Sequence, residues 1–410
     1  MKRVFIIANL FHASPRIPGL AKYLPKFGWE PIVLTVPIGD NKDVHPNCRY
    51  IEVPYENKLK VSYEKRSMNI KKHIKNQRLK NYLYNLYGSI FYYPDAEKNW
   101  REPAIKKACE FINNEKIDAL LSSSSPVTCH LIAKYLKEKY KIPWVADLRD
   151  LWTQNHNYPY GLIRKIIEKR LELKTLNDAN VITTVSKPWS EKLKILYKKV
   201  LVYTITNGFD PDILRKKEAL LKSKFTVTYT GQIYPEKQDP SKLFVALREL
   251  ISEGTINPNN IEIRFYGVES KFLLNYISKY DLSKIVEIYE KIPRDMSIEK
   301  QRESHLLLLL NWEDSKEKGV YPLKVFEYLA AKRPILATGG SDDVIKDLLE
   351  ETNAGFYCKT IEDVKIILRD LYSNYKNKNV ELFNGSTEKI NKYSYLNMAM
   401  KFAEYLNNCL

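Results

Sequence analysis

The residues with the clearest chemical potential are a lysine and a glutamate one helical turn apart, Lys324 and Glu327. Apolar residues around them recur at helical spacing, so the sequence predicts a helix over residues 323–331. Backbone N–H groups at the start of a helix bind anions, and Lys324 adds a positive charge there. The Glu327 carboxylate can accept two hydrogen bonds from a vicinal diol such as a ribose. The pair indicates a ligand with phosphates and hydroxyls; an ordinary surface ion pair is the alternative.

The segments on either side of this helix predict a βαβ unit. Five consecutive leucines, Leu306 to Leu310, are typical of a strand buried on both faces, and residues 335–337 predict another strand. A polar loop containing Gly319 and Pro322 precedes the helix, and a glycine loop follows the second strand. Open α/β sheets bind ligands at the carboxyl ends of their strands, so we expect these loops to face the ligand.

The sequence KVFEYLAAKRPILAT, residues 324–338, resembles the donor-nucleotide motif of glycosyltransferase family 4, whose enzymes have the two-domain GT-B fold. The resemblance implies that Glu327 binds the nucleotide ribose and that the neighbouring loop, with Gly319 and Tyr321, holds the diphosphate and the sugar. The usual motif has another glutamate eight residues before this one, where the present chain has Gly319. The family's standard contact with a sugar hydroxyl is therefore missing, and three nearby acidic residues could replace it: Glu313, Asp314 and Glu317.

A second loop of the predicted donor domain is expected to contact the diphosphate. It begins at Gly231, after an alternating strand predicted over residues 225–230. The family usually places an arginine directly after this glycine and a lysine some residues later. Here the resemblance assigns these places to Gln232, a neutral donor, and Lys237. One cationic contact is absent, and Lys324 is the candidate to supply it.

The chain begins with another predicted βαβ unit: a strand over residues 3–9, a helix over 20–27 and a strand over 30–36. The loop before the helix contains Arg16 and Gly19. In the family this loop commonly holds a glycine pair near the donor phosphates and the acceptor. Arg16 is a candidate anion contact near the acceptor, with a solvent-facing position as the alternative.

Two further strand ends carry polar residues. A strand predicted over residues 117–121 ends in four serines, which would cap the next helix and leave hydroxyls such as that of Ser124 facing the ligand. The strand predicted over 143–146 continues into Asp147 and Asp150 on either side of an arginine. In related enzymes this strand end faces the transferred sugar. We assign Asp150 to the reacting side and Asp147 to the sugar's surroundings; a structural Asp–Arg pair is the alternative.

Length and composition indicate two domains without a membrane span. A chain of 410 residues is long for one core, and no apolar run approaches eighteen residues. The short apolar N-terminus is interpreted as a first strand, without a cleavage site for a signal peptide. Five scattered cysteines indicate reduced thiols in a cytoplasmic protein, and the six histidines show no metal-binding spacing.

Positive charge is concentrated in one segment. Residues 58–80 hold nine Lys or Arg against one Glu, a net +8 within a chain of +17, and tyrosines follow up to residue 93. This segment is either a solvated insertion or a contact with an anionic membrane surface. Single-stranded nucleic acid is a third possibility, but no nucleic-acid-binding module accompanies the segment. We predict the membrane surface, and hence a peripheral protein on the inner face of the membrane.

The predicted architecture is α/β: two Rossmann-like domains facing a central cleft. We place the acceptor domain at residues 1–206, the donor domain at 207–385, and a helix crossing back to the first domain at 386–410. The predicted reaction is sugar transfer from a nucleotide-sugar to an acceptor hydroxyl of a lipid-linked or cell-surface glycan, with retention implied by the resemblance. Lys237, Lys324 and Asp150 are the expected catalytic residues, without metal or cofactor. The alternatives are a nucleotide-sugar epimerase and a catalytically silent glycan-binding protein.

Overall fold

The protein forms two compact α/β units. The structure is a computed structural model that describes residues 1–10, 15–39, 44–45, 48–56, 92–217, 219–235, 237–268, 270–313, 318–340, 343–377 and 383–410. One unit comprises residues 1–206 with 395–410, and the other comprises residues 207–394. The chain thus divides between Thr206 and Asn207, and residues 386–394 belong to the second unit.

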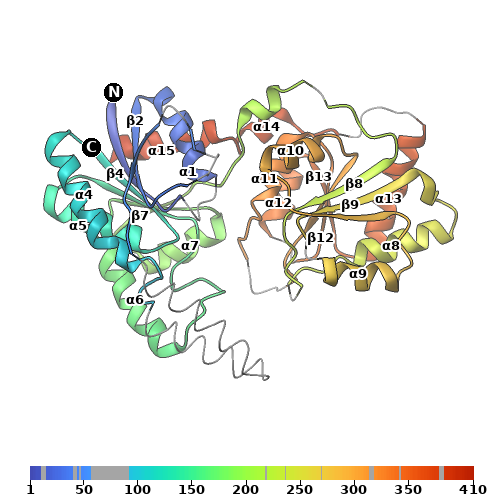
Figure 1. Ribbon diagram of the computed structural model, residues 1–410, viewed down its shortest axis with the longest axis horizontal. Coiled ribbons are helices and arrows are strands. Elements are labelled where there is room, and N and C mark those ends of the chain that lie inside the picture. The colour runs from blue at the N-terminus through green and yellow to red at the C-terminus, as the bar shows by residue number, and fades with distance from the viewer. Residues whose placement is uncertain are drawn as a thin grey trace. The chain divides into compact units, whose positions relative to one another are not determined.

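The first unit is built on a seven-stranded parallel sheet in the order β3-β2-β1-β4-β5-β6-β7 (Figure 1). Its strands are β1 (Lys2–Ile7), β2 (Trp29–Thr35), β3 (Arg49–Glu52), β4 (Ala119–Ser124), β5 (Trp144–Leu148), β6 (Val181–Thr184) and β7 (Leu201–Thr204). Its helices are α1 (Arg16–Tyr23), η1 (Leu24–Phe27), η2 (Lys98–Trp100), α4 (Arg101–Asn114), α5 (Thr128–Tyr140), α6 (Leu162–Leu176), α7 (Lys187–Leu196) and α15 (Tyr395–Asn408). Every residue of β4 and β5 is buried, as expected for a parallel sheet covered on both faces.

The second unit is built on a six-stranded parallel sheet in the order β10-β9-β8-β11-β12-β13 (Figure 1). Its strands are β8 (Phe225–Thr230), β9 (Ile261–Tyr266), β10 (Val286–Tyr289), β11 (Leu306–Leu310), β12 (Ile335–Thr338) and β13 (Gly355–Cys358). Its helices are η3 (Pro211–Arg215), α8 (Ser241–Ser252), η4 (Pro258–Asn260), α9 (Ser270–Lys279), α10 (Arg294–Arg302), α11 (Lys324–Ala331), α12 (Val344–Thr352), α13 (Ile361–Lys376) and α14 (Thr387–Asn391). The leucines of β11 alternate between the apolar clusters on the two faces of the sheet, which confirms the predicted buried strand.

The C-terminal helix α15 completes the first unit, as the predicted fold requires. Its apolar face, including Phe402, packs in the same cluster as Leu20 of α1. Gly19 permits this approach, because a Cβ at that position would lie 2.4 Å from the ring of Tyr395. Gly19 therefore has a packing role between two helices, and its predicted proximity to an acceptor stays a prediction.

The serines after the third predicted strand are part of the strand itself. β4 extends to Ser124, three residues beyond the predicted end, and α5 has no side-chain cap at its first residue. The predicted serine cap is therefore wrong. Instead, the carboxylate of Asp95 accepts hydrogen bonds from the amide and the hydroxyl of Thr128, each at 2.8 Å.

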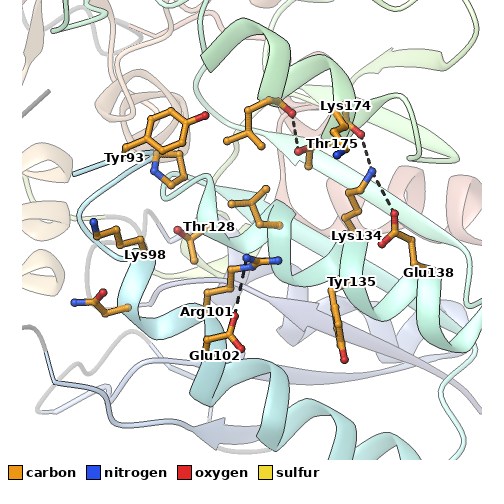
Figure 2. Close-up of a pocket in the computed structure, with 14 residues that line it drawn as sticks. Tyr93, Lys98, Arg101, Glu102, Thr128, Lys134, Tyr135, Glu138, Lys174 and Thr175 are labelled. Atoms are coloured by element: carbon orange, nitrogen blue, oxygen red, sulfur yellow. Dashed lines mark hydrogen bonds and ion pairs between the residues drawn. The ribbon is translucent and has the colours of Figure 1, made fainter. Parts of the chain in front are cut away.

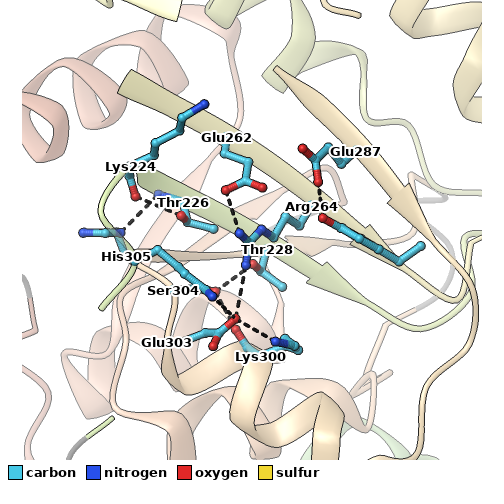
Figure 3. Close-up of polar contacts among 12 residues, drawn as sticks. Lys224, Thr226, Thr228, Glu262, Arg264, Glu287, Lys300, Glu303, Ser304 and His305 are labelled. Carbon is cyan, nitrogen blue, oxygen red and sulfur yellow. Dashed lines mark hydrogen bonds and ion pairs between the residues drawn. The ribbon is translucent and has the colours of Figure 1, made fainter. Parts of the chain in front are cut away.

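A polar network ties together the strands of the second sheet toward their amino ends (Figure 3). Arg264 of β9 pairs with Glu262 at 2.7 Å and with Glu303 at 3.1 Å. The amide of Thr226 donates to Nδ1 of His305 at 3.1 Å, which links β8 to the start of β11. Since these charges satisfy one another, this end of the sheet has a structural role.

Candidate functional site

The strongest candidate site lies at the carboxyl edge of the second sheet, where β8 and β11 are neighbours. From β8 the chain builds the sheet outward through β9 and β10, and from β11 outward through β12 and β13. Such a switch point leaves a crevice between the loops that follow the two central strands. Two contacts fix these loops together. Gln238 Nε2 donates to the carbonyl of Leu310 at 2.6 Å, and the Glu313 amide donates to the carbonyl of Lys237 at 2.9 Å.

Lys324, the first residue of α11, carries a buried ammonium group with no hydrogen-bond partner in the part of the chain that the structure describes. Its Nζ lies 3.7 Å from the centroid of the Tyr229 ring. Gly231 lies beside it: a Cβ there would be 3.4 Å from Nζ, and the backbone φ of +95° itself favours glycine. A buried charge without a partner is costly, so this arrangement calls for an anion.

Burial lowers the pKa of Lys324 to about 7, while the negative charge of Glu327 acts in the opposite direction. An anion close to Nζ would favour the charged form and raise this pKa again. The helix start contributes backbone N–H groups and the positive end of the helix dipole. Lys324 and the first turn of α11 are therefore the strongest candidate for an anion-binding site, and their contact with a diphosphate stays a prediction.

Glu327 lies one turn further along α11, and its carboxylate is oriented by two residues of α10. Arg294 Nε donates to Oε1 at 2.8 Å, and Gln301 Nε2 lies 3.5 Å from Oε2. The sequence analysis did not find Arg294 or Gln301, since nothing local links a residue of α10 to a glutamate about thirty positions later. Oε2 has the weaker of the two contacts, so it is the oxygen better suited to accept from a diol.

Three further buried side-chain oxygens near these strand ends have no hydrogen-bond partner among the described residues. They are Gln301 Oε1, Asn311 Oδ1 and Thr338 Oγ1. Asn311 directly follows β11, and Thr338 is the last residue of β12; the amide of Asn311 donates to the carbonyl of Thr338 at 2.9 Å. Buried polar atoms normally have partners, so each of these three oxygens needs an explanation, and a bound ligand would supply one.

Glu313, one candidate to replace the family's missing glutamate, packs against the glycine loop after β12. A Cβ on Gly339 would lie 2.6 Å from its Oε1, and the same oxygen pairs with Lys242 at 3.2 Å. The other two candidates, Asp314 and Glu317, lie outside the described residues. Glu313 is thus held beside the loop at the carboxyl end of β12.

Of the remaining predicted donor residues, two lie on the loops of the switch point and two lie in the segment before α11. Lys237 Nζ stacks 4.1 Å from the Trp312 ring, and the carbonyl of Gln232 accepts from the Tyr229 hydroxyl at 2.7 Å, so both lie on the loops of the switch point. The amide of Gly319 donates to the carboxylate of Asp343. Tyr321 packs on Phe326, with ring centroids 5.5 Å apart, in a different apolar cluster from that of Tyr229. Tyr321 thus has a packing contact within its own unit, and its predicted contact with the ligand stays a prediction.

In the first unit, Arg16 and Asp147 form a buried ion pair. The guanidinium donates to both carboxylate oxygens, at 3.0 and 2.8 Å, and both side chains are fully inaccessible to solvent. Ser123 and Thr183 each donate to the same carboxylate at 2.8 Å. Burial favours the neutral acid, but the charge and hydrogen bonds of Arg16 outweigh it, and the pKa of Asp147 lies below its usual range.

This pair changes the interpretation of both residues, because each is the buried partner of the other. Arg16 is neither solvent-facing nor positioned to reach an acceptor directly, since its guanidinium also donates to the carbonyls of Ile205 and Thr206 at 2.9 and 2.8 Å. Its Cζ lies 5.2 Å from the centroid of the Phe402 ring in α15. Arg16 thus joins α1, β5, the chain after β7 and the C-terminal helix.

The other two residues predicted for the first unit differ in accessibility. Ser124 is buried, and its carbonyl accepts from Arg149 Nε at 2.9 Å. The predicted contact of its hydroxyl with the ligand stays a prediction. Arg149 also donates to the carbonyl of Ser125 at 2.7 Å. Asp150, in contrast, is exposed at the carboxyl end of β5. Asp150 can therefore reach a ligand, and its role in the reaction stays a prediction.

A cavity of about 490 Å³ lies in the first unit among α4, α5 and α6 (Figure 2). Three of its cationic residues are Arg101, Lys134 and Lys174. Lys134 pairs with Glu138 at 3.3 Å and donates to the carbonyl of Lys174 at 2.7 Å. The cavity is lined mainly by helical residues, and Thr128 at the start of α5 is among them. Lys134 has partners, whereas the buried Nε of Arg101 has no hydrogen-bond partner among the described residues. We do not assign this cavity a ligand.

Two classes of feature are not seen in the described residues. They contain no group of three His, Cys, Asp or Glu residues placed to hold a metal ion. In the same residues, no helix combines the length and the apolar character needed to cross a bilayer. The basic segment 58–80 and most of the tyrosines after it lie outside the part of the chain that the structure describes.

No protein-family model matches the sequence, and no curated protein is similar to it at the sequence level. Solved structures are similar over the whole chain. HepE of Anabaena in complex with UDP gives a TM-score of 0.63 at 12% identity, covering 100% of both chains. Sucrose-phosphate synthase from Thermosynechococcus elongatus gives 0.61 at 12% identity, covering 100% of this chain and 99% of the other. A proposed UDP-N-acetylglucosamine 2-epimerase from Listeria monocytogenes gives 0.58 at 13% identity, with 100% and 96% covered.

These similarities show the fold. The chain has the α/β architecture of GT-B proteins, with two parallel sheets that account for its whole length. The predicted fold class is confirmed.

Proposed function

We propose that this protein is a glycosyltransferase that moves a sugar from a nucleotide-sugar to an acceptor hydroxyl, and that it belongs with glycosyltransferase family 4. The observation that carries the proposal is the buried, unpartnered ammonium of Lys324 at the start of α11. It lies at the switch point of a GT-B sheet, where a diphosphate would supply the missing negative charge. The UDP bound to the structurally similar HepE supports a nucleotide-sugar donor.

In the proposed reaction the protein acts mainly by stabilising the departing diphosphate. Lys324 and the N–H groups of α11 are fixed before the reaction, so they are ready for the charge that develops on the leaving group. Lys237 adds a second cation from the loop after β8. Glu327 binds the ribose diol, and Asp150 acts on the side of the acceptor. No metal is required in this scheme, and the sugar is transferred with retention.

The proposed acceptor is a lipid-linked or cell-surface glycan, extended at the inner face of the membrane. Its support is the +8 charge of residues 58–80, which suits an anionic lipid surface. Nucleic acid is not among the proposed partners.

The second candidate function is nucleotide-sugar epimerisation, and the similarity to the Listeria monocytogenes protein is the observation that favours it. A third candidate is a catalytically silent glycan-binding protein. The anion site argues against that one, since a protein that binds only glycans has no need for a buried cation prepared for a diphosphate.

Product analysis with labelled nucleotide-sugars distinguishes these functions. We expect release of the nucleoside diphosphate and label in an acceptor glycan, at a rate that an excess of chelator leaves unchanged. Label recovered in an epimeric nucleotide-sugar would establish the second candidate. Activity that is lost in chelator and restored by a divalent cation would contradict the metal-free scheme.

A substitution at Glu327 tests the assignment of the ribose site. Glu327→Ala should weaken binding of the nucleoside diphosphate by about 1.5–3 kcal/mol, because hydrogen bonds to a charged group are lost. The affinity is measured by calorimetry, with inorganic pyrophosphate as a second ligand that lacks a ribose. Pyrophosphate affinity should change much less.

The matched control is Glu350→Ala, an exposed glutamate of α12 that lies 3.9 Å from a lysine of its own helix. It should leave both affinities unchanged. If Glu327→Ala and Glu350→Ala bind the nucleoside diphosphate equally well, Glu327 does not hold the ribose.

A further inference from the structure

The N-terminal half of α6 exposes an unusual amount of apolar surface. Leu162 and Ile163 are 80% and 79% exposed, and Ile166 and Ile167 are 58% and 49% exposed. They occupy the first two turns of the helix, at the spacing that places them side by side. Single exposed apolar residues are common, but four adjacent ones on one helix indicate a surface that binds something. We call these four residues the α6 apolar face.

The first turn of α6 is held in place by buried contacts. Arg164 is buried and pairs with Glu168 at 2.6 Å. Its guanidinium also donates to the carbonyls of Tyr92 and Pro94, at 2.6 and 3.1 Å. These contacts fix the orientation of the helix. The α6 apolar face therefore lies on an ordered turn and not on the frayed end of a helix.

The charges exposed on α6 all have one sign. Both of its glutamates, Glu168 and Glu172, are buried, and Glu172 accepts hydrogen bonds from Thr153 and from the hydroxyl of Tyr197. The charged residues that reach solvent are basic: Lys165, Lys169, Arg170 and Lys174. A helix that presents leucine and isoleucine together with lysine and arginine has the composition of helices that lie in the surface of an anionic bilayer.

The position of α6 in the fold shows at which edge of the first sheet the α6 apolar face lies. α6 follows β5 along the chain, so its first turns lie toward the carboxyl edge of the first sheet (Figure 1). The exposed Asp150 lies two residues after the end of β5, at the same edge. A bilayer that covered the α6 apolar face would lie close to this edge. An acceptor anchored in the same bilayer could then reach Asp150 without leaving the membrane.

We infer that the α6 apolar face docks the protein on an anionic membrane, with its leucine and isoleucine side chains in the acyl boundary and its basic residues among the headgroups. The inference concerns where the protein is held, and its test does not depend on glycosyl transfer. It also assigns membrane contact to a helix distinct from the basic segment 58–80. A second copy of the chain fits the α6 apolar face less well than a membrane does. It would place its own basic residues against those of the first copy, and like charges repel.

The test is co-sedimentation of the full-length protein with vesicles. One set of vesicles is made of phosphatidylcholine with phosphatidylglycerol, and the other of phosphatidylcholine alone. Ile163→Gln/Ile167→Gln should reduce partitioning onto the anionic vesicles by at least about tenfold, because two apolar side chains no longer leave water. Its thermal midpoint should not fall, since both side chains are exposed.

Two controls match these changes. Ile195→Gln alters an isoleucine of α7 that is 76% exposed and separate from the α6 apolar face, and it should bind vesicles like the wild type. Lys169→Gln/Arg170→Gln should weaken binding to anionic vesicles, whereas Lys198→Gln/Lys199→Gln, which changes two exposed lysines elsewhere, should do so much less.

Four results would overturn the inference. The wild type could fail to bind vesicles, or bind both kinds equally. The α6 variant could bind as well as the wild type, which would assign membrane contact to another part of the chain. Gel filtration could show a wild-type dimer that the α6 variant converts to a monomer without any change in vesicle binding, which would make the face a contact between two copies.

Discussion

Lys324→Met should lower the turnover of nucleotide-sugar by about 10²–10³-fold, the size of effect seen when one fixed donor to a developing negative charge is removed. Methionine replaces the unbranched apolar stem of the lysine and omits its charged end, so the packing around position 324 is largely preserved. The thermal midpoint at pH 7 should stay the same or rise, because the variant no longer buries an ammonium group without a partner. Turnover and thermal unfolding are measured on the same preparations, with Lys389→Met, an exposed lysine of α14, as the control.

The pH dependence of diphosphate binding provides an independent measurement on the same residue. The pKa of about 7 in the folded protein lies below the ordinary value of 10.5, so above pH 7 the free site increasingly holds a neutral amine. A bound diphosphate favours the ammonium, and binding then takes up a proton. Affinity of the wild type for pyrophosphate should therefore fall above pH 7, by up to about tenfold per pH unit. The same fall in Lys324→Met would show that another group is responsible.

Arg16→Met should destabilise the protein by about 3–5 kcal/mol, the usual consequence of removing one partner of a buried ion pair. The substitution leaves the carboxylate of Asp147 in the core with two hydroxyl donors and no positive charge. Because the folded pKa of Asp147 is depressed, the pair contributes its stability above the unfolded value of about 3.9 and loses it as the pH falls through the folded value. Urea unfolding at pH 7 measures the change.

Two comparisons separate this effect from a general sensitivity to mutation. Arg49→Met breaks an ion pair with Glu115 whose side chains are 50% and 26% exposed, and its effect should be far smaller. Arg16→Met/Asp147→Leu removes both charges and should recover part of the lost stability. If Arg16→Met unfolds at the same urea concentration as Arg49→Met, the buried pair is not a main support of the first unit.

The strands of the second unit were predictable because local pattern determines them. Residues 225–230 and the five leucines of β11 are short apolar or alternating runs between polar loops, and burial on both faces is the simplest way to satisfy them. The serines of β4 could not be predicted in the same way. A serine hydroxyl fits a buried strand only if it has a partner, and the partner of Ser123 is Asp147, 24 residues later.

The candidate site was predicted in part for the same reason. Lys324 and Glu327 share one helix, so their spacing is visible in the sequence. The ring of Tyr229 beneath Lys324 and the guanidinium of Arg294 beside Glu327 come from other elements, about 95 and 33 positions away. The burial of Arg16 was missed because its partner is 131 residues distant. Sequence pattern thus identifies residues that act through their own helix or loop, and misses those whose role is set by distant partners.

The return of residues 395–410 to the first unit determines the order in which the protein can fold during synthesis. The second unit is one continuous stretch, residues 207–394, with its two ends joined by a bridge between Phe209 and Ser394. It can fold as soon as it has been translated. The first unit must wait for α15, which covers α1 and the Arg16 guanidinium. At about 5–20 residues per second, that wait lasts roughly 10–40 s after residue 206 is made. During this interval the apolar side of α1 has no α15 to cover it.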